Sequence, residues 1–206
     1  MSDFTPADVD EAVHWFVDTF SDTPAADWES LAGPLTWTCW ETAEHVADDL
    51  FFYATQLTTR TPPRETHLPF SCTANREGGP ENTVGADRAG GVPGLLAVVE
   101  SCGHLLSAVI TTADPNLVAH HTYGQARPEG FAAMGVVELL VHAYDIATGL
   151  GTPWTPPTPL VTRTLTKLFP HVEPTDDPAA TLLWATGRGT LPNRPPVGEW
   201  RWINTH

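Results

Sequence analysis

Basic residues are scarce in this 206-residue chain: 10 lysines and arginines stand against 25 aspartates and glutamates, for a formal net charge of −15. Nucleic acids and anionic membranes bind through basic patches, so this balance argues against both as partners. Cysteines are also few. Cys39, Cys72 and Cys102 are widely spaced and form no CxxC pair. We therefore expect buried structural thiols, not a disulfide framework or a cysteine–zinc site.

Long apolar runs and familiar catalytic signatures are missing too. The sequence has no run of about 18 apolar residues, so we expect no membrane span. The segment 1–6 lacks the basic and apolar regions of a signal peptide, which predicts a cytoplasmic protein. There is no G-x-S-x-G elbow, no glycine-rich loop followed by GK[ST], and no cysteine–histidine pair in a recognisable context. Serine hydrolases, cysteine hydrolases and nucleotide-binding enzymes are therefore disfavoured.

Helical periodicity is present over much of the chain. Four long helices are expected at about 6–20, 39–58, 93–112 and 131–148, the second beginning at a Thr38–Glu41 capping box. Two shorter helices are expected after residue 158. Twenty prolines and 16 glycines predict structured loops between these elements. The sequence thus predicts an all-α fold in a single domain, 1–206, in which a helical and irregular extension, 151–206, packs on the helices of 1–150 through Trp200 and Trp202.

The fourth predicted helix carries an unusual polar stripe. Glu138, His142 and Asp145 lie on one face of a segment that is otherwise almost wholly apolar, and such a helix is normally buried. Burying two carboxylates and an imidazole is costly unless a metal ion or strong hydrogen bonds compensate. Glu138 and His142 are four residues apart, so both can reach one ion, and they suit zinc, nickel, iron or manganese. A third ligand would have to come from another helix.

Other histidines are less clearly functional. The helical wheel places His45 opposite the apolar face of the second helix, on a stripe with Glu41, Asp49 and Phe52, which predicts a surface residue. A metal-lined cleft would also need such a polar stripe. His14 and His104 are expected to be structural or solvated, and the adjacent His120 and His121 are not expected to bind metal.

Three blocks in order resemble the DinB/YfiT-type superfamily, specifically its mycothiol-dependent maleylpyruvate isomerase branch. The first runs from Trp37-Thr38 to Glu44-His45-Val46-Ala47-Asp48. The second runs from Gly130-Phe131 through Glu138-Leu139-Leu140-Val141-His142-Ala143-Tyr144-Asp145. The third joins Leu182-Leu183-Trp184-Ala185-Thr186-Gly187-Arg188 to Trp200-Arg201-Trp202. Together they span most of the chain from residue 37 onward.

The resemblance implies a DinB-like four-helix bundle that carries one divalent metal ion, with zinc as the first choice and nickel as the second. On matching positions its ligands are His45, Glu138 and His142. Three protein ligands with an open fourth position are typical of catalytic zinc sites. The resemblance further implies that mycothiol or a similar small thiol binds there as cosubstrate and attacks a small electrophile, in an S-transferase or isomerase reaction.

The sequence leaves several roles open. The resemblance and spacing leave Asp145 either orienting a ligand or substrate, or holding the fourth helix to a neighbour. Arg188 or Arg201 could bind a substrate carboxylate, or could be structural or surface residues. The competing hypotheses are a non-catalytic metal-binding protein of the DinB-like type, acting in stress or dimerisation, and a purely structural bundle in which Glu138 and His142 bond only to each other. A homodimer is compatible with the resemblance.

Overall fold

The computed structural model describes residues 4–204, and over this range the chain is mostly helical. The four long helices are α1 (Pro6–Phe20), α2 (Cys39–Gln56), α3 (Gly91–Thr112) and α4 (Pro128–Leu150). Two shorter ones follow, α5 (Thr158–Leu168) and α6 (Pro178–Ala185). The remaining elements are short: the 3-10 turns η1 (Ala25–Glu29) and η2 (Arg88–Gly90), and an antiparallel pair of strands, β1 (Thr73–Ala74) and β2 (Glu81–Asn82). The chain is therefore mostly helical, which is compatible with the predicted all-α fold.

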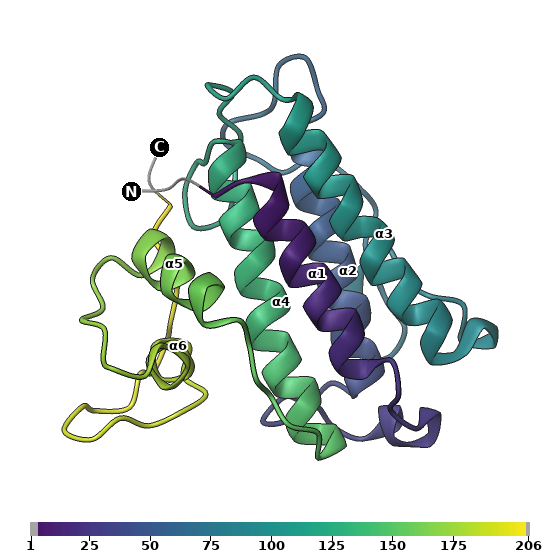
Figure 1. Cartoon of the computed structure of the whole chain (residues 1–206). Helices are drawn as coiled ribbons and strands as arrows, with labels where there is room; N and C mark the ends of the chain where they lie inside the picture. The colour runs from purple at the N-terminus through teal and green to yellow at the C-terminus, as the bar shows by residue number, and fades with distance from the viewer. Residues whose placement is uncertain (1–3, 205–206) are drawn as a thin grey trace.

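The long helices lie side by side, and α1 and α2 each pack against both α3 and α4 (Figure 1). Neighbours on several sides explain why α4 is apolar nearly all round, since almost its whole length is buried. Gly135 lies at a close approach of α4 to α2 and α3. A Cβ there would come 2.7 Å from Leu106 Cδ2 and 3.1 Å from Leu50 Cδ2. This tight packing holds the polar stripe of α4 in a fixed position.

The polar face of α2 does not point into open solvent, because the loop between α2 and α3 covers it. Glu41 closes the predicted capping box with Thr38 and also accepts two hydrogen bonds from Arg76, which hold the pKa of Glu41 below its usual value. One turn further on, Glu44 Oε1 accepts the backbone N–H of Ala86 at 3.0 Å. Asp48 Oδ1 accepts two backbone N–H groups of the same loop at 2.7 Å. Side chains on this stripe are therefore partly enclosed.

The segment after α4 packs along that helix (Figure 1). Trp154 Nε1 donates to the backbone oxygen of Leu140 at 3.0 Å, and Lys167 pairs with Glu129 at the start of α4. Trp202 is buried, and the backbone N–H of the next residue, Ile203, donates to the Leu168 oxygen at 2.9 Å. The C-terminal segment thereby brings two tryptophans and Arg188 against the α4 surface.

The cysteine prediction needs one correction. Cys39 and Cys102 are buried free thiols, and burial raises the pKa of each to about 11. Cys72 is free but exposed, since it lies in the loop next to β1 and not on a helix face. It contacts the Thr83 hydroxyl at 3.3 Å.

Two segments are long and apolar enough to cross a membrane by length and composition alone: 88–112 and 128–150. In the second, 94% of the apolar window is buried inside the protein, so its place in the core accounts for its composition. These segments are weak evidence for membrane insertion, and they are compatible with a soluble protein.

Candidate metal centre

The three predicted ligands line one cavity of about 270 Å³ between α2 and α4. His45 comes from α2, while Glu138 and His142 come from α4, and the centroids of the two imidazole rings lie 5.3 Å apart. The remaining lining residues are Asp49, Tyr53, His121, Thr122, Tyr123, Trp200 and Trp202. The cavity is thus built from two helices, the 121–123 loop and the C-terminal segment.

Glu138 and His142 face each other one turn apart on α4. His142 Nε2 lies 3.3 Å from Glu138 Oε2, as the four-residue spacing on a helix allows. The other carboxylate oxygen, Oε1, accepts the Tyr53 hydroxyl at 3.1 Å. Tyr53 therefore fixes the carboxylate from α2 and leaves Oε2 directed toward His142.

Asp145 lies behind His142 and has two partners. Its Oδ2 is 3.1 Å from His142 Nδ1, and it also accepts two-pronged hydrogen bonds from Arg188, with Nη2 at 2.7 Å and Nε at 2.9 and 3.1 Å. Asp145 is fully buried and the Arg188 side chain is only 7% exposed. Both roles considered for Asp145 are therefore compatible with its contacts: it can orient His142, and it joins α4 to the segment after α6. Arg188 is committed to this pair.

His45 is half-buried, contrary to the helical-wheel expectation of a surface residue. The loop that covers the polar face of α2 is the physical reason, together with the Trp37 ring, whose centroid lies 4.9 Å from that of His45. His45 Nε2 lies 3.2 Å from Asp49 Oδ2, one turn along α2. A histidine–carboxylate pair on α2 thus faces the carboxylate–histidine pair on α4.

The charges around the cavity shift several pKa values. Burial, aided by the nearby His142, lowers the pKa of His45 to about 4. Burial alone would lower the pKa of His142, but its hydrogen bonds to Asp145 and Glu138 outweigh burial and raise it to about 9. Burial and the Glu138 charge raise the pKa of Asp49 well above its usual range. Within residues 4–204, Glu138 and Asp49 form ion pairs only with histidines and not with an arginine or lysine. A cation bound between these two carboxyl groups would therefore be stabilised.

The residues are of the kinds that bind a divalent metal ion, but their ligand atoms are not gathered as tightly as in a finished site. Within residues 4–204, the group of three ligand atoms that all lie within 4.8 Å of one another is elsewhere in the fold, and no three ligand atoms of the cavity meet that distance. Two imidazoles and one or two carboxylates suit zinc or nickel. Zinc–ligand bonds are about 2.0–2.1 Å long, so ligand atoms of a tetrahedral site lie about 3.3–3.4 Å apart. The separations within the two pairs, 3.3 and 3.2 Å, are close to this spacing. Asp145 on His142 Nδ1 is the outer hydrogen bond that metal-binding histidines usually have.

Three lining residues escaped the sequence reasoning. Asp49 could have been found, because it follows His45 at the four-residue spacing that singled out Glu138 and His142. Tyr53 has no comparable signal in the sequence. His121 was dismissed because adjacent histidines rarely bind one ion, yet it is buried, burial lowers its pKa to about 4, and its ring stacks on Trp202 with centroids 5.4 Å apart. Arg201 is exposed and lies at a neighbouring outer pocket.

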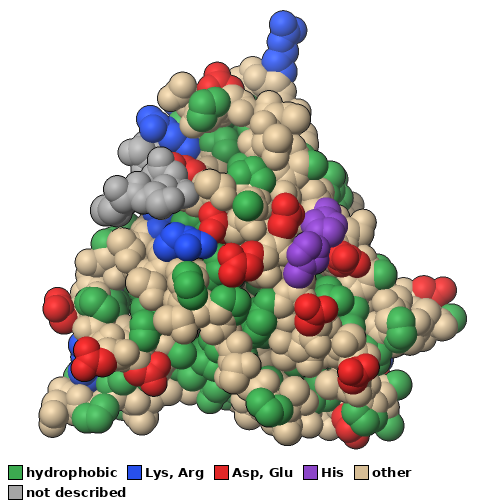
Figure 2. All heavy atoms as spheres, viewed as in Figure 1, with side chains coloured by type: hydrophobic (Ala, Val, Ile, Leu, Met, Phe, Trp, Pro, Cys, Tyr) green, Lys and Arg blue, Asp and Glu red, His purple; other side chains and the backbone are tan. Residues whose placement is uncertain are grey.

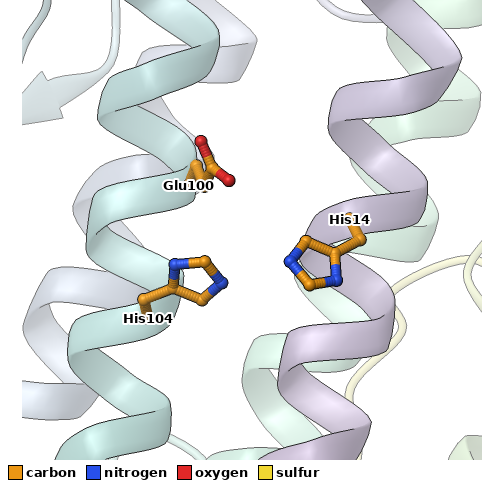
Figure 3. Close-up of side chains that lie close together, drawn as sticks. All are labelled: His14, Glu100 and His104. Carbon is orange, nitrogen blue, oxygen red and sulfur yellow. The ribbon is translucent and has the colours of Figure 1, made fainter.

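A second group of ligand-type side chains lies far from this cavity in the helix arrangement. His14 of α1 and Glu100 and His104 of α3 form, within residues 4–204, a group whose three ligand atoms all lie within 4.8 Å of one another (Figure 3). This group could hold a metal ion, which is compatible in part with the expected divalent metal. The sequence predicted only structural or solvated histidines here, and both histidines are indeed exposed.

Comparison with family models, with curated proteins and with solved structures finds no match for this chain. Its function is therefore inferred from its own residues and their geometry.

Proposed function

We propose that the chain is a DinB-like four-helix bundle that holds a divalent metal ion on His45, Glu138 and His142 and transfers or isomerises a small electrophile with the help of a low-molecular-weight thiol of the mycothiol type. The observation that supports this most is the cavity in which the α4 pair faces the α2 pair, with a hydrogen-bond partner behind each α4 ligand. Zinc is the metal we favour, and nickel is the alternative.

A bound divalent ion supplies one chemical function, which is to lower the pKa of a coordinated thiol so that its thiolate is available at neutral pH. The protein residues prepare the site for it. Tyr53 holds Glu138 in place, and Asp145 with Arg188 holds the His142 ring. Preorganised ligands lose little freedom when the ion binds, which favours tight and specific binding.

The aromatic residues at the cavity mouth are proposed to position the electrophile and limit water. Trp202 stacks on His121 and meets the Tyr123 ring edge-on, with centroids 4.9 Å apart. The outer pocket of about 760 Å³ shares Tyr123 and Trp200 with the cavity and is also lined by Arg201. We assign the polar part of the thiol or a substrate carboxylate to this outer pocket, with Arg201 as its cationic partner. Arg188, which is paired with Asp145, is not assigned this role.

One observation favours the non-catalytic alternative. Asp49 offers a fourth protein donor next to His45. Four protein ligands would close the coordination shell, as in structural zinc sites, and leave no position for a thiol. Asp49→Asn separates the two functions: thiol-dependent activity survives the change if the fourth position belongs to the thiol, and metal affinity falls sharply if it belongs to Asp49.

The decisive experiment measures zinc content after dialysis, by elemental analysis, in the wild type, His45→Ala and His142→Ala. Because the second ligand group could also take up zinc, each variant is prepared with and without His104→Ala. We expect the cavity ion to be lost or weakened more than about 100-fold in both cavity variants, since even loss of an outer partner costs 10–100-fold. His171→Ala, an exposed histidine near Phe169, is the matched control. Full zinc retention by His45→Ala would refute the ligand set.

A second measurement tests the thiol. Mycothiol should raise the melting temperature of the zinc-loaded protein and leave the metal-free protein unchanged, and the zinc-loaded protein should conjugate mycothiol to an activated aryl halide. Stabilisation by zinc without any effect of mycothiol would select the non-catalytic alternative. If the cavity takes up neither zinc nor nickel, both the catalytic and the non-catalytic metal-binding functions are excluded, and a structural bundle is the remaining alternative.

A further inference from the structure

The surface between α1 and α3 carries two acid–histidine pairs at four-residue spacing. Glu100 and His104 lie one turn apart on α3, and Asp10 and His14 lie one turn apart on α1. Figure 3 shows the His14 ring facing His104 across the gap between the helices, with Glu100 one turn away on α3. In Figure 2 a pair of histidines is exposed over α1 and α3 with acidic side chains on both sides. Four ligand-type side chains thus converge from two helices.

The ligand atoms are close enough to share one ion. Those of His14, Glu100 and His104 all lie within 4.8 Å of one another, and the two rings meet edge-on with centroids 5.4 Å apart. Asp10 Oδ1 lies 4.0 Å from His104 Nε2. This oxygen is covered by neighbouring atoms and has no hydrogen-bond partner among the described residues. Shifts of about 1 Å, which exposed side chains make by rotating about their χ angles, bring such atoms to metal-binding distances.

The helix backbones beneath the cluster are held in register by direct packing. A Cβ at Gly103 would overlap Val13 Cγ2, so α1 and α3 make a close approach one residue from both histidines. One turn further along α3, the Ser107 hydroxyl donates to the backbone oxygen of Pro6 at 3.3 Å. Because these contacts fix the two helices, the backbone positions of the ligand residues are preorganised, and only their exposed side chains must rotate to meet an ion.

We propose that this cluster is a second metal site, in which His14, Glu100 and His104 bind one divalent transition-metal ion and Asp10 supplies further negative charge. Two imidazoles select ions such as zinc, nickel or copper over magnesium and calcium, which prefer oxygen ligands. The ion bridges α1 and α3 and so opposes the separation of α1 from the other helices. The site shares no residue with the cavity between α2 and α4 and does not depend on the proposed function.

Equilibrium dialysis with zinc chloride tests the stoichiometry. Wild type should bind two zinc ions per chain, His104→Ala and Glu100→Ala one each, and the double variant His104→Ala with His142→Ala none. His171→Ala should behave as wild type. If the cavity binds no zinc but this proposal holds, His142→Ala binds as much zinc as the wild type and His104→Ala binds none. If this proposal fails, His104→Ala binds as much zinc as wild type.

Hydrogen exchange of the α1 amides tests the bridging role in the full chain. At free zinc 100 times the dissociation constant, local opening that breaks the site should fall by about 100-fold, and exchange in α1 should slow in proportion. The effect should vanish in His104→Ala and persist in His142→Ala, and magnesium at the same concentration should have none. Zinc-independent α1 exchange in wild type, or equal protection in His104→Ala, would overturn the proposal.

Discussion

The cavity between α2 and α4 and the surface between α1 and α3 carry the same kind of residue pairs in different surroundings. In each place two helices face one another, and each helix offers a histidine and a carboxylate four residues apart. They lie on opposite sides of the helix arrangement, since α1 and α2 each pack between α3 and α4 (Figure 1). The two places differ in the contacts that hold the histidines and carboxylates in position.

In the cavity, the α4 ligands are buried and each has a fixed partner: Tyr53 on Glu138 and Asp145 on His142. On the surface, His14 and His104 are exposed, and only the close packing of the α1 and α3 backbones beneath them fixes their positions. Residue spacing alone therefore marks a place where an ion could bind. Burial and outer hydrogen bonds decide how strongly the stability of the fold depends on the residues at that place. Removing support should therefore have large effects in the cavity and small ones on the surface.

The largest effect is expected from Arg188→Ala. It removes the two-pronged partner of the fully buried Asp145 and leaves only His142 beside that carboxylate, and breaking a buried ion pair in this way costs about 3–5 kcal/mol of unfolding free energy. Glu29→Ala, which removes an exposed partner of Arg88, should cost about 1 kcal/mol or less. Urea titrations of both variants measure the difference. If Arg188→Ala lowers the unfolding free energy by less than about 1 kcal/mol, the ion pair behind the cavity contributes no more to stability than the exposed pair of Glu29 and Arg88.

Gly103→Ala should weaken zinc binding at the surface site and leave zinc binding in the cavity unchanged. The new methyl group overlaps Val13, so α1 must shift, at a cost of about 1–3 kcal/mol for overpacking. Zinc binding by His14 and His104 should weaken with the shift, while the cavity keeps its ion. Gly94→Ala on the same helix is the control, since a Cβ there meets nothing within 4 Å. Calorimetry of zinc binding separates the two sites. Unchanged zinc affinity at the surface site would show that this affinity does not depend on how α1 and α3 are aligned.

Tyr53→Phe should weaken zinc binding in the cavity by about 10–100-fold, the usual cost of losing an outer hydrogen bond to a ligand. The ring keeps its packing against Phe131, so the helical circular dichroism should not change. Tyr144→Phe, on the same helix as the ligands but beside Trp154, should bind zinc normally. Equal affinities in the two variants would show that Glu138 needs no support.

Periodicity predicted the helices well because each long one has an apolar face that must be buried. The predicted and observed bounds of α1 agree, and those of α4 differ by only a few residues at each end. The stripe of Glu138, His142 and Asp145 was visible because the rest of α4 is apolar. The pairing of Asp145 with Arg188, 43 residues away in sequence, was not predictable from either residue's surroundings in the chain.

His45 marks the limit of reasoning from a helical wheel. A wheel sees one helix, whereas the enclosure of His45 comes from Trp37 and from a loop that follows the helix by more than 20 residues. The same limit applies to His14 and His104, whose proximity depends on the antiparallel register of α1 and α3. Only tertiary contacts decide which polar stripes face each other.

The smallest effect is expected from Asp10→Asn. Asp10 Oδ1 lies 4.0 Å from His104 Nε2, and at about that distance in water a unit charge and a divalent ion interact by about 2 kcal/mol, part of which salt screens. Removing this charge should therefore weaken surface zinc binding by about tenfold. Asp22→Asn makes the same charge change beyond the end of α1 and should have less effect. Because the interaction is between exposed groups, raising the salt concentration should bring the two variants together. A loss of more than about 100-fold in Asp10→Asn would instead make Asp10 a direct ligand, and the surface site would then resemble the cavity, with paired ligands from both helices.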